Sequence, residues 1–208
     1  MNSSYQSPFK PKFIKNYIPK NIKIYTFNAG FKKRNDDLLL VEFNKPANIS
    51  AVYSKTSTPS APIIWDKKNN KGNCKILVVN SGNANAHTGK KGIIEIDKYA
   101  NRICKFFKCK KNEILVSSTG VIGEQLSSDK IIKTINKINK KSKTKNILDA
   151  AKAIMTTDTF PKTNYNTFTS NGKKEKVFGF AKGSGMIAPN MGTMLAYIFI
   201  ETSLSKKD

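Results

Sequence analysis

A threonine at the start of an apolar segment is the residue of this sequence best suited to chemistry. In "GSGMIAPNMGTMLAYIFI", Thr193 follows a series of small residues and precedes a run typical of a strand. A threonine hydroxyl needs a base beside it, and its own α-amino group can be that base once the residue becomes a chain terminus. That amine has a pKa of roughly 7.7–8.0, so it can accept the hydroxyl proton near neutral pH. Gly192 would leave its carbonyl open to attack, which makes Gly192–Thr193 a candidate cleavage site, although on pattern alone a threonine that merely begins a strand is the commoner case.

Three loops of small residues are the candidate positions for a site, because a sheet holds the loops at its strand ends rigidly. They are Ser81–Gly89, Ser117–Gly123 and Gly183–Gly192. None of them matches a glycine-rich phosphate or dinucleotide motif. The single His87 leaves few options for a catalytic triad, and a zinc site would need several more ligands. The sequence therefore favours threonine chemistry, with no metal site.

The charge of the chain has two interpretations. The 208 residues carry a formal net charge of +23, with lysines spread over the whole sequence. A nucleic-acid interface would collect basic residues on one face among stacking aromatic residues. The diffuse pattern favours a solvated basic surface, and a basic nucleic-acid-binding scaffold stays the alternative.

Two features of the sequence indicate where the protein is located: it shows no membrane or signal segment, and its cysteines show no metal-binding spacing. No run approaches the ~18 consecutive apolar residues of a membrane helix, and no signal-peptide core is visible. Three cysteines, Cys74, Cys104 and Cys109, show no metal-binding spacing. Reduced thiols of this kind suit the cytoplasm.

Alternating strands and helices are predicted along the chain. Short apolar runs predict strands at 22–27, 37–43, 49–55, 74–80 and 113–116, with a loop over 54–65. Helical stripes are formed by Ile96, Tyr99, Ile103 and Phe106–Phe107, then by Ile131, Ile135 and Ile138, with a third helix from Ile147. A hairpin over 164–183 would turn at Asn171-Gly172, and a last buried strand would span 193–202. The pattern predicts an α/β (α+β layered) fold: a single domain over 21–202, between a flexible basic arm at 1–20 and a polar tail at 203–208.

Four motifs taken in order resemble one known family. "VVNSGNANAHTG", "VSSTGVIGEQLSSDK", "AAKAIMTTDTFPK" and "AKGSGMIAPNMGTML" resemble the ornithine acetyltransferase (glutamate N-acetyltransferase) family of arginine biosynthesis. The resemblance covers about Phe27 to Glu201. It implies a layered α/β sandwich similar to N-terminal-nucleophile hydrolases, which is incomplete in this chain. It also implies a precursor that cuts itself before the threonine, here between Gly192 and Thr193.

The resemblance implies a role for each matching residue. Thr193 would be the nucleophile that carries the acetyl group, and Thr119 with Gly120 would form the oxyanion hole. Each such donor contributes about 3–4 kcal/mol in a comparable site. Lys182 and Thr156, with Thr157 as the fallback, would bind substrate. On pattern alone, Lys182 could equally be one more surface lysine, and Thr119 a turn residue.

The implied reaction is a two-step exchange that uses neither metal nor cofactor. N2-acetyl-L-ornithine would give its acetyl group to Thr193, and L-glutamate would then accept it. Use of acetyl-CoA as a second acetyl donor is left open by the sequence, as is the oligomeric state.

The family's chains are about twice as long, so the resemblance matches residues 21–192 to the first (α) chain and 193–202 to the opening strand of the second (β) chain. A fragment, a split gene whose other half is separate, and a decayed remnant are all open. The last strand would then expose apolar surface and an unpaired edge, which invites a partner such as that separate or missing β chain in a hetero-oligomer. A truncated non-catalytic subunit is the alternative function.

Overall fold

Two separate sheets build the molecule in the computed structural model, which describes residues 17–139, 142–186, 189 and 192–202. The polar tail and most of the predicted basic arm therefore lie outside the described residues. The four-stranded sheet contains β1 (Ile22–Phe27), β2 (Leu38–Asn48), β3 (Asn73–Asn83) and β4 (Ile114–Val121), in that order. Its β1, β2 and β3 pair antiparallel, whereas β3 and β4 are parallel. The three-stranded sheet is antiparallel and contains β5 (Lys162–Ser170), β6 (Lys173–Lys182) and β7 (Leu195–Glu201).

The four-stranded sheet is buried on both faces, which explains its unbroken apolar runs. Successive side chains of a strand point to opposite faces. Leu38 and Leu40 of β2 accordingly join one core, whereas Leu39 and Val41 join the other. Because both faces are covered, the strands read as continuous apolar segments rather than as alternating ones.

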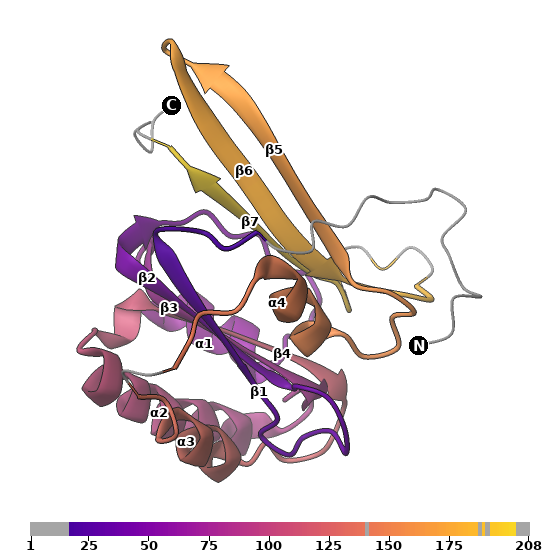
Figure 1. Ribbon diagram of the computed structural model, residues 1–208. Helices are drawn as coiled ribbons and strands as arrows, with labels where there is room; N and C mark the ends of the chain where they lie inside the picture. Colours follow the sequence, from indigo (N-terminus) through magenta and orange to yellow (C-terminus); the bar gives the residue numbers. More distant parts are fainter. Residues whose placement is uncertain (1–16, 140–141, 187–188, 190–191, 203–208) are drawn as a thin grey trace.

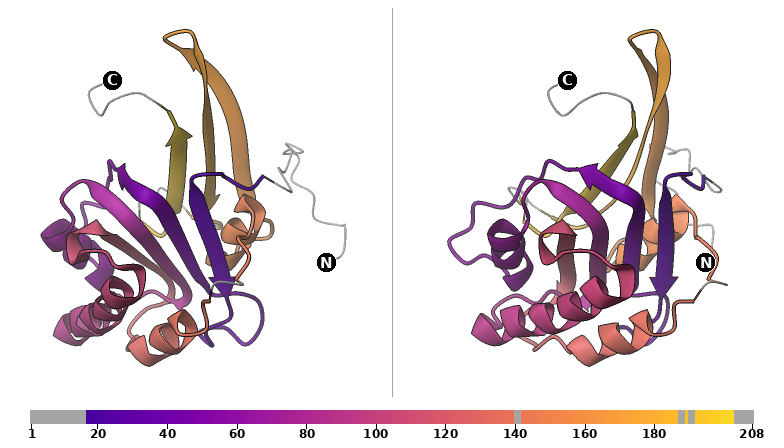
Figure 2. Two further views of the ribbon diagram at one scale, coloured as in Figure 1. Left: turned by 60° about the vertical axis from the view of Figure 1, so that its left-hand side comes forward. Right: turned by 90° about the vertical axis from the view of Figure 1, so that its left-hand side faces the viewer.

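A helical layer covers one face of this sheet (Figures 1 and 2). It contains α1 (Ala61–Asn69), α2 (Gly89–Phe107) and α3 (Ser128–Ile135), and a short 3-10 turn (Lys111–Glu113) leads into β4. The predicted stripes are confirmed, because the side chains of Ile96, Tyr99, Ile103, Ile131, Ile135 and Ile138 are all buried in this core.

Two predictions before α2 are wrong. Residues 49–55 form no strand, and the side chain of Val52 is 76% exposed. The last pair of the β2–β3 ladder is Asn48 with Asn73, and after one further bond from Ile49 N–H to the Gly72 carbonyl oxygen the described chain offers no partner strand. The predicted loop 54–65 ends early, because α1 begins at Ala61 with a proline in its first turn, where a missing N–H costs nothing.

The other face of the four-stranded sheet is covered by α4 (Ile147–Ile154) and the three-stranded sheet. Helix α4 begins in a capping box between Asn146 and Asp149. Phe178, Phe180 and Phe199 of the three-stranded sheet join the core on this side. The layered α/β arrangement predicted from the sequence is thereby confirmed, while the extent of the single domain over 21–202 stays a prediction.

The three-stranded sheet extends beyond the rest of the molecule at the tip of the β5–β6 hairpin (Figure 1). The hairpin turns at Asn171 and Gly172, whose φ angles are +50° and +72°, as predicted. The prediction that the last strand is buried is wrong. It forms an edge of its sheet, with Phe199 inside and Ile198 and Ile200 exposed by 74% and 55%. The expected exposure of apolar surface on this strand is confirmed.

Candidate active site

The two sheets meet where the small-residue segments lie. At the ends of the parallel strands β3 and β4, Ser81 pairs with Thr119, and Gly82 with Gly120. The predicted loops at 81–89 and 117–123 therefore begin as strand, because β3 runs to Asn83 and β4 to Val121. Lys182 ends β6 of the other sheet, close to these strand ends.

Lys182 contacts two other predicted site residues. Its Nζ donates to Thr119 Oγ1 at 3.0 Å and to the Thr193 carbonyl oxygen at 3.3 Å. The residue is only 3% exposed, so it is not one more surface lysine. An ammonium has three donors, and one of them stays available for a further acceptor. The structure therefore brings Thr119, Lys182 and Thr193 together as one cluster.

Gly120 lies where the two parallel strands approach most closely. Its φ is +135°, and a Cβ atom at this position would lie 2.3 Å from the Gly82 carbonyl carbon. Only glycine avoids both the unfavourable backbone region and this clash. The close approach holds Gly120 beside the buried Thr119, which is 7% exposed.

Thr193 is the centre of a strained three-residue turn. Its φ is +66°, a conformation that is an outlier for a β-branched residue. Met194 N–H donates to the Gly192 carbonyl oxygen at 2.8 Å, and this closes the turn around the candidate cleavage bond. Much of the segment before Gly192 (187, 188, 190 and 191) lies outside the described residues.

Asp158 is the residue of this region that sequence reasoning missed. Its carboxylate accepts hydrogen bonds from Gly183 N–H at 2.8 Å, Thr156 N–H at 3.2 Å and Lys162 Nζ at 2.6 Å. The only available signal was an acidic residue among the threonines of "TTDTF". Through this carboxylate the backbone of Thr156 is tied to the residue that follows Lys182. The side chains of Thr156 and Thr157 themselves are exposed.

Burial and charge shift the pKa values of both ionisable groups. Burial lowers the pKa of the Lys182 ammonium below its usual range, although the nearby Asp158 carboxylate opposes this effect. Burial alone would raise the pKa of Asp158, but the hydrogen bonds from Lys162, Gly183 and Thr156 together hold it below its ordinary value. Asp158 is therefore charged at neutral pH, while Lys182 is a cation whose charge depends on its surroundings.

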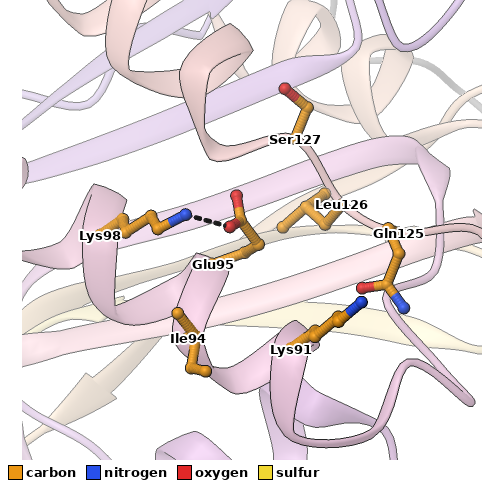
Figure 3. A pocket seen from close by; sticks show the side chains of 7 residues that line it. All are labelled: Lys91, Ile94, Glu95, Lys98, Gln125, Leu126 and Ser127. Atoms are coloured by element: carbon orange, nitrogen blue, oxygen red, sulfur yellow. Dashed lines mark hydrogen bonds and ion pairs between the residues drawn. The ribbon is translucent and has the colours of Figure 1, made fainter.

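The described surface includes two hollows, and neither of them is lined by Thr119, Lys182 or Thr193. A shallow groove of about 430 Å³ runs over the three-stranded sheet, from Lys162 and Ala181 towards Ile198. The other hollow, of about 450 Å³, lies beside α2, where Glu95 and Lys98 pair at 2.5 Å and Gln125 faces Lys91 (Figure 3).

The described residues contain neither a metal-binding cluster nor a membrane-spanning helix. Among them, no group of three or more His, Cys, Asp or Glu side chains could hold a metal ion. Over the same part of the chain, no helix is long and apolar enough to cross a bilayer. All three cysteines are free thiols.

The two-sheet fold places the chain among layered α/β proteins similar to N-terminal-nucleophile hydrolases. In this chain, threonine and lysine side chains lie together where the two sheets meet. The chain belongs to the ArgJ family, whose model matches residues 23–208. This membership confirms the resemblance seen in the four sequence motifs.

Similar proteins bear out the assignment. The arginine biosynthesis bifunctional protein ArgJ of Bartonella henselae is 42% identical over 188 residues, which are 89% of this chain and 46% of the relative. The protein of the same name from Caldanaerobacter subterraneus is 41% identical over 190 residues, 91% of this chain and 47% of the relative. The chain thus spans about half the length of these relatives.

Solved structures show the same fold. The arginine biosynthesis bifunctional protein ArgJ of Bacillus halodurans superposes with a TM-score of 0.76 at 33% identity, over 85% of this chain and 92% of that one. Ornithine acetyltransferase of Mycobacterium tuberculosis, solved in complex with ornithine, gives a TM-score of 0.68 at 27% identity, over 82% and 92%.

Proposed function

We propose that this chain provides the nucleophile of an acetyltransferase of arginine biosynthesis, which moves an acetyl group from N2-acetyl-L-ornithine to L-glutamate. Family membership supports the reaction, as does the relative that is named ornithine acetyltransferase and binds ornithine. The observation that carries the proposal is the strained turn at Thr193 beside Lys182 and Thr119.

Self-cleavage between Gly192 and Thr193 is the first step of the proposal. The Thr193 hydroxyl oxygen attacks the Gly192 carbonyl carbon, the C–N bond breaks, and the threonine nitrogen takes the proton. Water then hydrolyses the resulting ester, which leaves a Gly192 carboxylate and a free Thr193 amine. The Met194 N–H bonded to the Gly192 carbonyl oxygen polarises that carbonyl, and the left-handed Thr193 stores strain that cleavage releases.

Acetyl transfer then uses the new amine as base. It takes the Thr193 hydroxyl proton, and the hydroxyl oxygen attacks the acetyl carbonyl of N2-acetylornithine. Thr119 and the Gly120 N–H stabilise the negative oxygen, ornithine leaves with a proton on its amine, and acetyl-Thr193 remains. The glutamate amine attacks this ester and regenerates Thr193. The free donor of Lys182 pairs with a substrate carboxylate, and Thr156 contacts substrate at the mouth of the site.

No metal or cofactor takes part in this scheme, because the threonine amine supplies the base and two hydrogen-bond donors stabilise the oxyanion. Acetyl-CoA enters only as an alternative acetyl donor, and this is the activity that separates bifunctional enzymes from monofunctional ones. We place the protein in the cytoplasm, where its free thiols stay reduced.

A second polypeptide completes the proposed enzyme. The edge strand β7 carries exposed Ile198 and Ile200, and the groove over its sheet adjoins Lys162 of the site. An apolar, unpaired edge of this kind favours a partner that extends the sheet. A β chain, separate or continuous with this one in its precursor, fits this surface and the half-length overlap with the relatives.

Intact mass spectrometry tests the proposal. Wild type, Thr193→Ala and Thr193→Ser are purified with and without a co-expressed second half. A wild-type product that ends at Gly192, retained in the serine variant and absent in the alanine variant, supports Thr193 as the nucleophile. An uncut wild-type chain in the presence of its partner would overturn the proposal and favour the non-catalytic subunit.

A further inference from the structure

Asp158 lies at the junction of three segments around the candidate site. Its side chain is 1% exposed, and its carboxylate binds the start of β5 through Lys162, the chain after β6 through Gly183 and the chain after α4 through Thr156. A buried carboxylate with one ion-pair partner and two backbone donors is fully satisfied. Its position is therefore fixed relative to all three segments.

One lysine pairs with this carboxylate, and the charge of a second lysine depends on it. Lys162 takes the direct ion pair at 2.6 Å. Lys182 is buried but takes part in none of the ion pairs found among the described residues. Its charge is favoured by Asp158 and disfavoured by Lys162, the two charged groups that act on it. Without Asp158, a desolvated ammonium beside a second cation would lose its proton more readily.

The charge of Lys182 fixes the direction of the Thr119 hydroxyl. An ammonium can only donate, so Thr119 Oγ1 accepts at 3.0 Å and its own proton stays available for another acceptor. A neutral lysine has a lone pair, and the Thr119 proton could then turn towards Nζ. The same contact would thus have opposite polarity in the two charge states, and only the charged state leaves a donor for an oxyanion.

We propose that Asp158 is a positioning residue that keeps Lys182 charged, so that Lys182 keeps the Thr119 hydroxyl free to donate to the oxyanion. This inference rests on the proposed function for its catalytic consequence. The structural basis is the bond from Gly183 N–H, next to buried Lys182, to the Asp158 carboxylate, and the effect on Lys182 can be measured without any activity.

The first experiment is an NMR titration of the lysine side chains in the full chain labelled with 13C-lysine. The Lys182 signal is assigned by its loss in Lys182→Arg. In Asp158→Asn, the Lys182 midpoint is expected to move to lower pH, whereas Asp97→Asn is the matched control, because Asp97 pairs with Lys111 away from the cluster. An unchanged Lys182 midpoint in Asp158→Asn overturns the proposal whether or not the protein is active.

The second experiment follows the rate of acetyl transfer from N2-acetylornithine to glutamate against pH in the same variants, each co-expressed with the second half. The rate of Asp158→Asn is expected to fall first at alkaline pH. The alkaline limb of its pH–rate profile should move to lower pH, as the NMR midpoint of Lys182 does. In a Lys182→Arg background the charge is permanent, so Asp158→Asn should no longer move that limb. A merely structural Asp158 would lower the rate equally at every pH and in both backgrounds, and this result would overturn the proposal. Failure of the wild type to cleave would reject the proposed function, while the titration still decides on Asp158.

Discussion

Lys182 Nζ donates to Thr119 Oγ1 at 3.0 Å across the junction of the two sheets, from the end of β6 to the end of β4. Both residues are buried, at 3% and 7% exposure. A buried hydrogen bond from a charged donor is worth about 1.5–3 kcal/mol. The contact therefore helps to hold the sheets together as well as to place the candidate oxyanion donor.

Replacement of Thr119 by valine should remove both contributions, which the rate and the stability report separately. Valine keeps the shape but removes both the acceptor for Lys182 and the donor for the oxyanion. We expect acetyl transfer to fall about 10²–10³-fold. We expect the free energy of unfolding to fall by about 1–3 kcal/mol, because a buried donor loses its partner.

Thr119→Ser is the control for this experiment, since it retains the hydroxyl and should stay close to the wild-type rate. The formation of N-acetylglutamate gives the transfer rate, and urea unfolding gives the stability. If the valine variant were as fast as the wild type, Thr119 would not be an oxyanion donor.

Gly192→Ala should speed self-cleavage. Gly192 does not have a positive φ, so alanine is compatible with its backbone and has less conformational freedom than glycine. Its Cβ atom would lie 3.0 Å from the Pro189 carbonyl oxygen, which must move slightly. The gain of about 0.4–1 kcal/mol from such a change corresponds to a rate roughly 2–5 times higher.

Gly185→Ala provides the comparison for this variant in a time course of intact mass. Gly185 has open space around it but a φ of +64°, so alanine there is strained and should not accelerate the cut. Equal acceleration by both substitutions would contradict the explanation from local rigidity at residue 192.

The sequence predicts elements well where a local pattern decides them. The segment 22–27 forms a strand and the α2 stripe faces the core, because apolar periodicity is a property of neighbouring residues. The run at 49–55 fails as a strand for a reason outside itself, since β3 begins at Asn73 and offers no partner beyond it. Likewise, the composition of β7 is typical of a buried strand. One of its faces is nevertheless exposed, because only the other face of its sheet is covered by the described residues.

Local sequence patterns predict the site less well than they predict the helices and strands. Lys182 is one of 37 basic residues, and nothing in its neighbours distinguishes it from a surface lysine. What distinguishes it is burial against a strand 63 positions earlier in the chain, which only tertiary structure shows. Resemblance to a family selected Lys182, Thr119 and Thr193, and the structure brings them together. Asp158 lies next to this cluster, where it bonds Gly183 N–H, but was selected by neither pattern nor resemblance.

The exposed face of β7 should govern association without governing the fold. Ile198→Thr and Ile200→Thr keep a β-branched side chain on the exposed face while they remove apolar surface. We expect changes in the free energy of unfolding within about 0.5 kcal/mol, together with weaker binding of a co-expressed second half.

Light scattering after size-exclusion chromatography measures the association. Phe199→Ala on the buried face of the same strand is the contrast, and it should destabilise the fold by about 3–5 kcal/mol. Unchanged association of the double threonine variant would show that the partner does not bind this face.

Asp66 should make stability depend on pH in a direction opposite to that of most carboxylates. Its side chain lies in the helical-layer core at 3% exposure, where it accepts from Val116 N–H at 3.0 Å and Tyr53 hydroxyl at 3.4 Å. Burial raises its pKa from 3.8 to about 8, despite these hydrogen bonds. The folded state thus binds a proton that the unfolded state has already released between these two pH values.

Because the folded state holds more protons there, the free energy of unfolding should fall as pH rises from about 4 to about 8, by at most about 1.4 kcal/mol per pH unit from this group. The contribution is fully present below the unfolded pKa and is lost as pH rises through the folded one. Asp66→Asn resembles the protonated side chain, so its profile should be flatter and its stability at pH 8 higher than that of the wild type. Urea unfolding at one-unit pH intervals measures both profiles, with Asp97→Asn, an exposed carboxylate paired to Lys111, as the control. Parallel profiles for wild type and Asp66→Asn would show that Asp66 is charged in the folded protein.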